Sequence, residues 1–177
     1  MAFRLEFYPR GVLMLIKTLA GVLVLLALAA CDPQRIAELE EGVSTEADVR
    51  ARFGQPETIW DGAGGERIFE YNRQPAGHQN YMIGIGPDGR MTSLRQVLHP
   101  TTFAKVLPGM TTQEVRRMLG KPMKQTPYAL KNEIAWDWRY MEPPNQSMVF
   151  TVWFGPDERV LRTSTGPDRE APEHQGR

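Results

Sequence analysis

Two stretches of the chain repeat the same order of apolar and polar positions, 66 residues apart. Val49 and Phe53 in the first stretch, and Val115 and Leu119 in the second, are spaced four apart, which places each pair on one face of a helix. Further along, Glu133–Tyr140 alternates polar and apolar residues, the period of a half-buried strand. The pattern therefore predicts a helix followed by strands, present twice.

Both predicted helices carry start and stop signals. Thr45 with Asp48, and Thr111 with Glu114, have the spacing of a capping box, in which the hydroxyl and the carboxylate each accept a backbone N–H at the helix start. A glycine and a proline end each helix, at Gly54 and Pro56 and at Gly120 and Pro122. We expect two helices of about ten residues each, and we assign these acidic residues to capping rather than to acid–base catalysis.

Three strands are expected after each helix. They cover Glu66–Arg73, Tyr81–Ile85 and Arg90–Val97, and then Glu133–Tyr140, Met148–Phe154 and Arg159–Ser164. Gly-Pro-Asp turns precede the last strand of each set, since proline presets φ and aspartate bonds its own backbone. Upstream segments, Gln34–Glu41 and Thr102–Leu107, supply a first helical turn. Each repeat is thus predicted to be an α-α-β-β-β unit of the α+β class, a helical pair packed on a three-stranded antiparallel meander.

The repeats define the predicted domains. Residues 31–98 form the first unit, 99–102 a linker and 103–165 the second unit. The tail, 166–177, is predicted to be disordered because it has charge and proline but no periodic apolar residues. Units this small bury little surface, so we expect the two to share a core or a continuous sheet.

The first 30 residues have the layout of a secretory signal, with basic residues ahead of an apolar stretch, Leu19–Leu28. Cys31, the one cysteine of the chain, follows directly after Ala29 and Ala30. The segment from Leu28 to Cys31 is similar to the lipobox of bacterial lipoproteins. That resemblance implies cleavage between Ala30 and Cys31 and attachment of acyl chains such as palmitate to Cys31, which would anchor the chain durably in a membrane.

Two alternatives stay open at the N-terminus. Gly11–Ala30 is long enough for a retained membrane helix, although Lys17 interrupts it and leaves a stretch better suited to a signal core. Translation can start at Met1 or at Met14, and the anchor prediction holds for either start.

Composition excludes several classes of function. Lys and Arg total 21, as do Asp and Glu, so there is no basic excess of the kind that binds nucleic acid. Lipidation consumes the only thiol, which leaves none for a disulfide or a zinc site. His78, His99 and His174 fall in a loop, the linker and the tail, away from any acid or serine in a repeated element. Gly62–Gly65 lacks the Lys-Ser/Thr ending of a phosphate loop. We predict no enzyme, no catalytic residue, no metal and no cofactor.

The repeated motif resembles the SmpA/OmlA (BamE-like) family of outer-membrane lipoproteins. The stretch from Leu107 to Pro122 fits the family pattern, and that from Leu39 to Pro56 fits with a one-residue insertion. The resemblance implies the α-α-β-β-β fold and a non-enzymatic, protein-binding accessory role. It further implies a partner in the β-barrel assembly machinery, or a role in envelope integrity, at the periplasmic face of the outer membrane.

Two departures from the family keep alternatives open. The family has one unit and this chain has two, and the tandem arrangement is similar to that of the β-lactamase inhibitor protein. That similarity implies a membrane-tethered inhibitor of a periplasmic enzyme. Asp32, directly after the lipidated cysteine, resembles an inner-membrane retention signal, so the inner membrane is the alternative location.

The aromatic residues of the second repeat fall in two phases. Trp136, Trp138 and Tyr140 share one strand phase and are predicted to build the core. Trp153 lies on the opposite phase of the next strand, so it faces away from helices that cover the other side of the sheet. Because tryptophan is enriched at interface hot spots, Trp153 is the candidate partner-binding residue. Packing of Trp153 against the first repeat or a loop is the alternative.

Overall fold

The computed structural model describes residues 36 and 38–171. By its internal contacts the chain divides into one unit of residues 1–40 and another of residues 41–177. The predictions for the signal segment, Cys31 and Asp32 therefore lie outside the described residues, as do residues 34, 35 and 37 of the segment Gln34–Glu41. Within the described part of the chain, no helix is long and apolar enough to cross a membrane.

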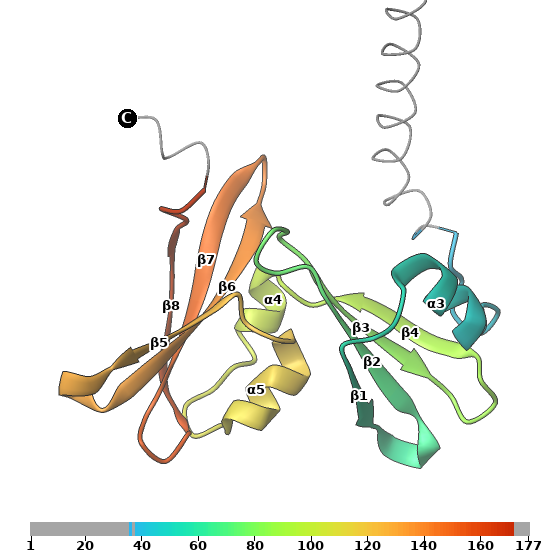
Figure 1. The fold of residues 1–177 in the computed structure, drawn as a ribbon, viewed down its shortest axis with the longest axis horizontal. Coiled ribbons are helices and arrows are strands. Elements are labelled where there is room, and N and C mark those ends of the chain that lie inside the picture. The colour runs from blue at the N-terminus through green and yellow to red at the C-terminus, as the bar shows by residue number, and fades with distance from the viewer. Residues whose placement is uncertain (1–35, 37, 172–177) are drawn as a thin grey trace, which may run out of the picture. The chain divides into compact units, whose positions relative to one another are not determined.

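The unit of residues 41–177 contains two antiparallel four-stranded sheets, in the orders β1-β2-β3-β4 and β5-β6-β7-β8 (Figure 1). The first half of this unit runs from helix α3 to strand β4. Its elements are α3 (Glu46–Phe53), β1 (Thr58–Asp61), a 3₁₀ turn (Ala63–Gly65), β2 (Arg67–Asn72), β3 (Asn80–Ile85) and β4 (Met91–Gln96). The second half runs from α4 to β8. Its elements are α4 (Pro100–Phe103), α5 (Thr112–Leu119), β5 (Lys124–Tyr128), a 3₁₀ turn (Ala129–Lys131), β6 (Glu133–Glu142), β7 (Gln146–Phe154) and β8 (Val160–Pro167).

Both capping boxes form as predicted. The Thr45 N–H donates to Asp48 Oδ2 at 2.8 Å and the Asp48 N–H donates to Thr45 Oγ1 at 3.3 Å. The corresponding distances for Thr111 and Glu114 are 2.7 and 3.2 Å. The glycine that follows each helix has a φ of 83° after α3 and 77° after α5, a conformation that favours glycine. Local signals therefore set both ends of each helix.

The predicted three-stranded meander is wrong by one strand in each half. β1 pairs with β2, where Thr58 lies opposite Glu70, and β5 pairs with β6, where Lys124 lies opposite Asp137. The β5 sequence has no apolar alternation and contains Pro127, so periodicity gave no strand signal there. Hydrogen bonding to the neighbouring strand, which involves residues distant in sequence, makes both segments strands.

The helical segment before α5 also differs from the prediction. α4 begins at Pro100, inside the range expected to be a linker, and ends at Phe103. Proline is favoured at the first position of a helix because its missing N–H is not needed there. In the corresponding segment of the first half, Gln34–Glu41, Ile36 is the one helical residue among those described, so the predicted helical turn does not extend through residues 38–41.

Equivalent hydrogen bonds recur in the two halves. The Tyr71 hydroxyl donates to the Gly54 carbonyl at 3.1 Å, and the Trp138 Nε1–H donates to the Gly120 carbonyl at 3.0 Å. In each case an aromatic residue of the sheet holds the end of the helix before it. Glu70 precedes Tyr71 and Asp137 precedes Trp138, so the two acidic residues occupy matching positions.

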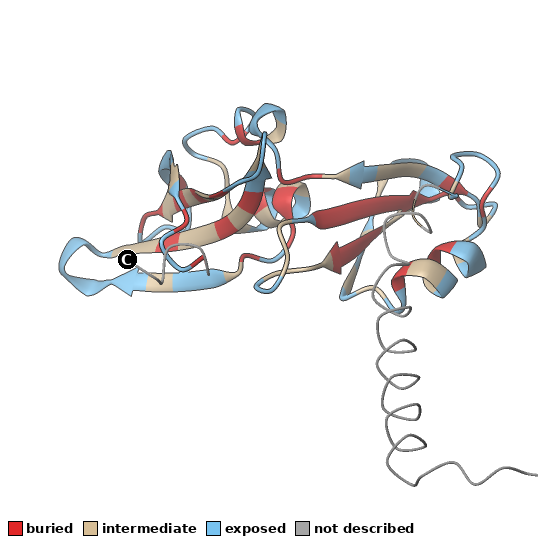
Figure 2. Ribbon diagram, turned by 90° about the horizontal axis from the view of Figure 1, so that it is seen from above, coloured by how far each residue is buried: buried red, intermediate tan, exposed pale blue. Residues whose placement is uncertain are grey.

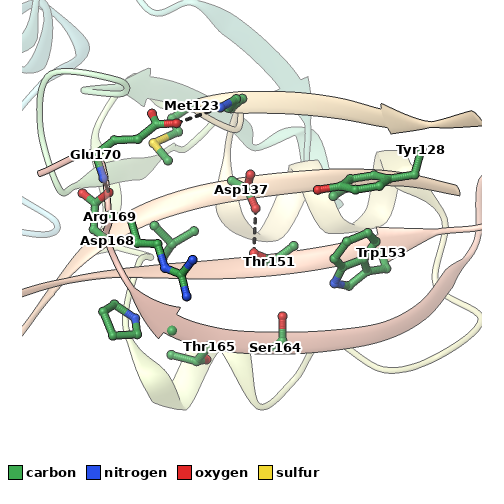
Figure 3. Close-up of a pocket in the computed structure, with 15 residues that line it drawn as sticks. Met123, Tyr128, Asp137, Thr151, Trp153, Ser164, Thr165, Asp168, Arg169 and Glu170 are labelled. Carbon is green, nitrogen blue, oxygen red and sulfur yellow. Dashed lines mark hydrogen bonds and ion pairs between the residues drawn. The ribbon is translucent and has the colours of Figure 1, made fainter.

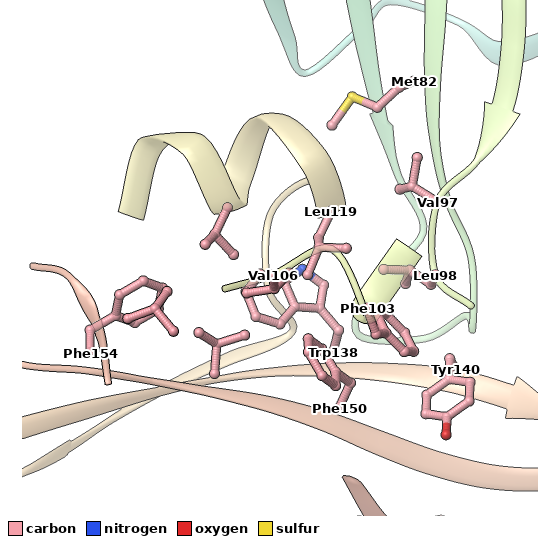
Figure 4. Packing of buried hydrophobic residues seen from close by; sticks show 13 residues of the cluster. Met82, Val97, Leu98, Phe103, Val106, Leu119, Trp138, Tyr140, Phe150 and Phe154 are labelled. Atoms are coloured by element: carbon pink, nitrogen blue, oxygen red, sulfur yellow. The ribbon is translucent and has the colours of Figure 1, made fainter. Parts of the chain in front are cut away.

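A cluster of buried side chains joins the two halves, as expected for small units (Figure 4). In the second half, Trp138, Phe150 and the Phe103 side chain of α4 lie together, with the Phe103 and Phe150 rings stacked at a centroid distance of 4.1 Å. Met82 and Val97 of the first half belong to the same cluster. The predicted core role of Trp136, Trp138 and Tyr140 is confirmed, with Trp136 partly buried against the cluster.

The tail prediction is wrong for residues 166–171. β8 continues to Pro167, and Asp168 and Ala171 are buried. Asp168 forms an ion pair with Arg139 and accepts a hydrogen bond from Ser147 Oγ at 2.9 Å. These contacts link residues far apart in sequence, so apolar periodicity could not reveal them. Residues 172–177 lie outside the described residues.

Candidate functional site

The first sheet is covered on both faces. α3 covers one face with Val49 and Phe53, and α5 of the second half covers the other. Strand β3 is consequently buried at every position (Figure 2). The Asn80 side chain of β3 donates to the Leu119 carbonyl of α5 at 2.8 Å. The face opposite α3 is therefore a site at which this fold already binds the end of a helix.

Glu70 is the polar centre of that covered face, with a side chain that is 0% exposed. Its carboxylate accepts from the Lys121 backbone N–H at 2.9 Å and from Trp60 Nε1 at 3.0 Å. The Arg116 Nη2 lies 3.5 Å from the same carboxylate. One buried acid thus binds the backbone just after α5 and an arginine side chain on it, which compensates the cost of burying its charge.

The matching face of the second sheet is not covered by any described helix. It forms an open groove of about 510 Å³ (Figure 3). Asp137, the counterpart of Glu70, lies in the middle of this groove and accepts a hydrogen bond from Thr151 Oγ1 at 2.6 Å. We refer to this groove as the open face.

Two positions beside Asp137 carry smaller side chains than their counterparts on the covered face, whereas Trp153 takes the place of Gly84. The strand registers match Ile68 of the covered face with Ala135, and Met82 with Thr151. On the covered face both Ile68 and Met82 pack against the core cluster that includes α5. The smaller pair leaves room above Asp137 for a group from outside the chain.

Trp153 lies at one end of the open face, on the side of the sheet away from α5 (Figure 3). Its ring centroid is 4.9 Å from that of Tyr128, and the Arg162 guanidinium lies 4.5 Å from its centroid. Arg162 also binds both carboxylate oxygens of Glu133, at 3.0 and 2.7 Å. These contacts hold the half-buried indole in one position, which lowers the entropy lost when a partner covers it.

Tyr128 and Arg162 were not anticipated from the sequence. Tyr128 comes from β5, whose strand character the sequence pattern did not reveal, and Arg162 lies in a predicted strand with a mixed apolar and polar sequence. The contact between Arg162 and Trp153 follows only from the pairing of β7 with β8, which places the two residues opposite each other. The predicted orientation of Trp153 away from the helices agrees with the structure. Its ring contacts are Tyr128, at the end of β5, and Arg162 of β8.

The other end of the open face is formed by the segment after β8. Burial would raise the pKa of Asp168, but hydrogen bonds from Arg139, Ser147 and the Glu170 N–H outweigh it, so the pKa lies below its ordinary value. Glu170 binds Lys124 Nζ at 2.8 Å and raises the pKa of that lysine. Through these contacts Asp168 and Glu170, which were predicted to be disordered, are held in place and form one wall of the groove.

The histidines lie apart from the open face or at its margin. His78 Nε2 is 2.9 Å from Ser147 Oγ, and His99 Nδ1 is 2.8 Å from Thr101 Oγ1. His174 lies outside the described residues. Among the described residues, no group of three or more His, Cys, Asp and Glu side chains is arranged to hold a metal ion.

Comparison with known families finds a match for the part of the chain that supplies most of the open face, though not for residues 165–170. Residues 96–164 match the outer membrane protein assembly factor BamE domain. This BamE-like stretch contains α4, α5 and β5 to β7, together with most of β8 and therefore Trp153, Asp137 and Tyr128. No curated protein sequence matches the chain significantly.

Two solved structures are similar to larger parts of the chain. One is a DUF4309 family protein, YjgB, from Bacillus subtilis, with 20% identity, 77% of this chain and 86% of that chain covered, and a TM-score of 0.32. The other is a putative β-lactamase inhibitor protein from Streptococcus mutans, with 12% identity, coverage of 70% and 82%, and a TM-score of 0.31. Similarity this distant does not bear on function.

Proposed function

We propose that the chain is a non-enzymatic lipoprotein that binds another protein at the periplasmic face of the outer membrane. In this proposal it is an accessory factor in outer-membrane protein assembly or envelope integrity. The observation that carries the proposal is the open face, a preformed groove with a positioned tryptophan inside the BamE-like stretch. The equivalent face of the first sheet already binds the end of α5, so the fold itself supplies an example of the binding mode.

The chemistry of the open face suits a protein partner. Trp153 and Tyr128 offer apolar area at one end, and Asp137 offers an acceptor for a basic side chain or a backbone N–H in the middle. Of the charged residues that line it, Lys124 is paired with Glu170 and Asp168 with Arg139. An apolar centre with a polar rim is the usual anatomy of a protein interface.

The Trp153→Ala variant tests this proposal. We expect the affinity for the partner to fall roughly 30-fold or more, the loss typical of a tryptophan hot spot. The free energy of unfolding should fall by about 1–2 kcal/mol, since the ring is half-buried and loses one aromatic pair, with Tyr128, and one cation–π contact, with Arg162. Affinity purification of the wild-type chain followed by titration of the recovered partner measures the first effect, and urea unfolding the second.

Leu130→Ala is the matched control, because Leu130 is a fully exposed apolar residue that does not line the open face. It should leave partner binding unchanged. Recovery of β-barrel assembly components supports the accessory role, whereas recovery of a single soluble hydrolase favours the tethered inhibitor. Equal partner binding by wild type and Trp153→Ala would rule out the open face as the contact surface.

The lipid anchor is tested by Cys31→Ser. Without the thiol no acyl chain can be attached, so we expect Cys31→Ser to incorporate no labelled palmitate and to keep its signal segment uncleaved. Ala29→Ser, two positions earlier, is the control and should remain membrane-bound. Separation of inner from outer membranes in the same experiment decides between the outer membrane and the location that Asp32 suggests. Equal palmitate incorporation by Cys31→Ser and the wild type would exclude the anchor.

A further inference from the structure

A second groove, of about 690 Å³, lies between the first sheet and the helices of the second half. We call it the junction groove. Ile68 and Met82 of the sheet and Met118 of α5 give it an apolar floor, and all three pack in or against the shared core. Ser93, Thr101 and Thr102 contribute hydroxyl groups to its lining. The groove is distinct from the open face, with which it shares no lining residue.

Three cations from three different elements surround the junction groove. Arg95 comes from β4, Lys105 follows α4 and Arg117 comes from α5, and all three residues are exposed. None of the described residues that line the groove is acidic. In a chain with equal numbers of acidic and basic residues, this local excess creates a positive potential above an apolar floor.

The junction groove also opens at the outer edge of the first sheet. Part of this edge is occupied, since the Met91 N–H donates to the Ser44 carbonyl at 2.8 Å and the Gly42 N–H donates to the Met91 carbonyl at 2.7 Å. β4 is the last strand of the first sheet, and its Val97 N–H donates to the Asn80 carbonyl at 2.9 Å. Because antiparallel ladders alternate, the backbone N–H and C=O groups of Leu94 and Gln96 then point away from β3. The Leu94 N–H accordingly bonds the Glu41 carboxylate, at 2.8 Å. Gln96, which lines the groove, directs its backbone groups outward in the same way.

We propose that the junction groove binds an extended, acidic segment of a partner protein, which adds a short strand to the β4 edge at Gln96, beyond the part of the edge that residues 41–44 occupy. Its backbone pairs with Gln96, and the side chains on one face of the added strand enter the groove. Acidic side chains there meet Arg95, Lys105 and Arg117, and apolar ones cover the floor. A strand edge needs alternating backbone donors and acceptors, which a peptide supplies and an acyl lipid does not. The site is independent of the function proposed for the open face.

The probe is a fluorescent, acetylated peptide with the repeat Glu-Thr-Leu-Thr, which places Glu and Leu on one face of a strand. Anisotropy titration with the full chain in detergent should show saturable binding that weakens as salt is added. Each of Arg95→Glu, Lys105→Glu and Arg117→Glu should weaken binding about five- to tenfold, because each removes one attraction and adds one repulsion. Lys131→Glu, the same charge change at an exposed residue outside the groove, should bind like wild type.

Two further peptides separate strand addition from simple charge attraction. Replacing each Glu by Gln should abolish most of the affinity, and replacing each Thr by Pro, which removes backbone donors, should do the same. Equal binding of the proline peptide, or unchanged binding by all three charge reversals, would overturn the proposal. The proposal would also be overturned if vesicles of phosphatidylserine in phosphatidylcholine bound the chain through Arg95, Lys105 and Arg117 while the peptide did not bind. Trp153→Ala should bind the probe normally, so failure at one surface is distinguishable from failure at the other.

Discussion

Replacing Glu70 by Ala is expected to lower the free energy of unfolding by about 3 kcal/mol. The carboxylate is fully buried, and it accepts from the Lys121 N–H, Trp60 Nε1 and Arg116. Removing it leaves three donors beneath α5 without their acceptor, and a buried donor that loses its partner costs its full desolvation. The loss also loosens the contact by which the second half covers the first sheet.

Glu57→Ala is the matched comparison, because Glu57 also binds Lys121, through Nζ at 2.6 Å, but at the surface. Surface ion pairs contribute little, so we expect a loss of less than about 1 kcal/mol there. Urea unfolding of the two variants and the wild type measures both effects. A similar small loss in both would show that Glu70 does not hold the two halves together.

Replacing Asp168 by Ala is expected to have a comparable effect, about 3 kcal/mol. Asp168 is 1% exposed, it pairs with Arg139, whose side chain is 14% exposed, and it accepts from Ser147. The variant leaves the arginine charge without its partner in a confined site. Glu170→Ala, two residues later in an exposed pair with Lys124, should cost less than about 1 kcal/mol. Equal losses from the two variants would indicate that the segment after β8 contributes no specific buried contact.

The Asp168 contribution should also depend on pH. Its pKa lies below the ordinary value of 3.8, since hydrogen bonds from Arg139 and Ser147 outweigh the effect of burial. The charged form is therefore favoured by folding, and the stabilisation is complete above the unfolded pKa and is lost as the pH falls through the folded one. The difference in stability between wild type and Asp168→Ala should be constant near neutral pH and shrink below about pH 4. A difference that grew on acidification would contradict the charge assignment.

The parts of the fold that could be predicted are those set by neighbours in sequence. The capping boxes join residues three apart, and the alternation in β6 is visible within ten residues. β1 and β5 could not be predicted, because their strand character comes from pairing with β2 and β6 rather than from their own apolar pattern. The order of residues 166–171 was missed for the same reason, since Asp168 is held by Arg139 and Ser147.

The candidate site was only partly visible in the sequence. Strand phase placed Trp153 on the side of the sheet away from the helices, and the structure agrees. The contacts that position it, with Tyr128 and Arg162, depend on strand registers that no local pattern encodes. The junction groove has no sequence signature at all, because Arg95, Lys105 and Arg117 lie on separate elements that meet only after folding.

The different environments of Glu70 and Asp137 show which features the sequence determined and which only the tertiary structure decided. The sequence alone set the repeated helices, their caps and the matching positions of these two acids, because such features depend on residues a few positions apart. It could not show that α5 would cover one sheet face and leave its counterpart open. That outcome depends on long-range packing, in which Ile68 and Met82 lie in or against the core cluster that includes residues of α5, whereas Ala135 and Thr151 line the groove. Two similar acids therefore differ in role, since Glu70 is buried beneath α5 and Asp137 lies in a groove open to a partner.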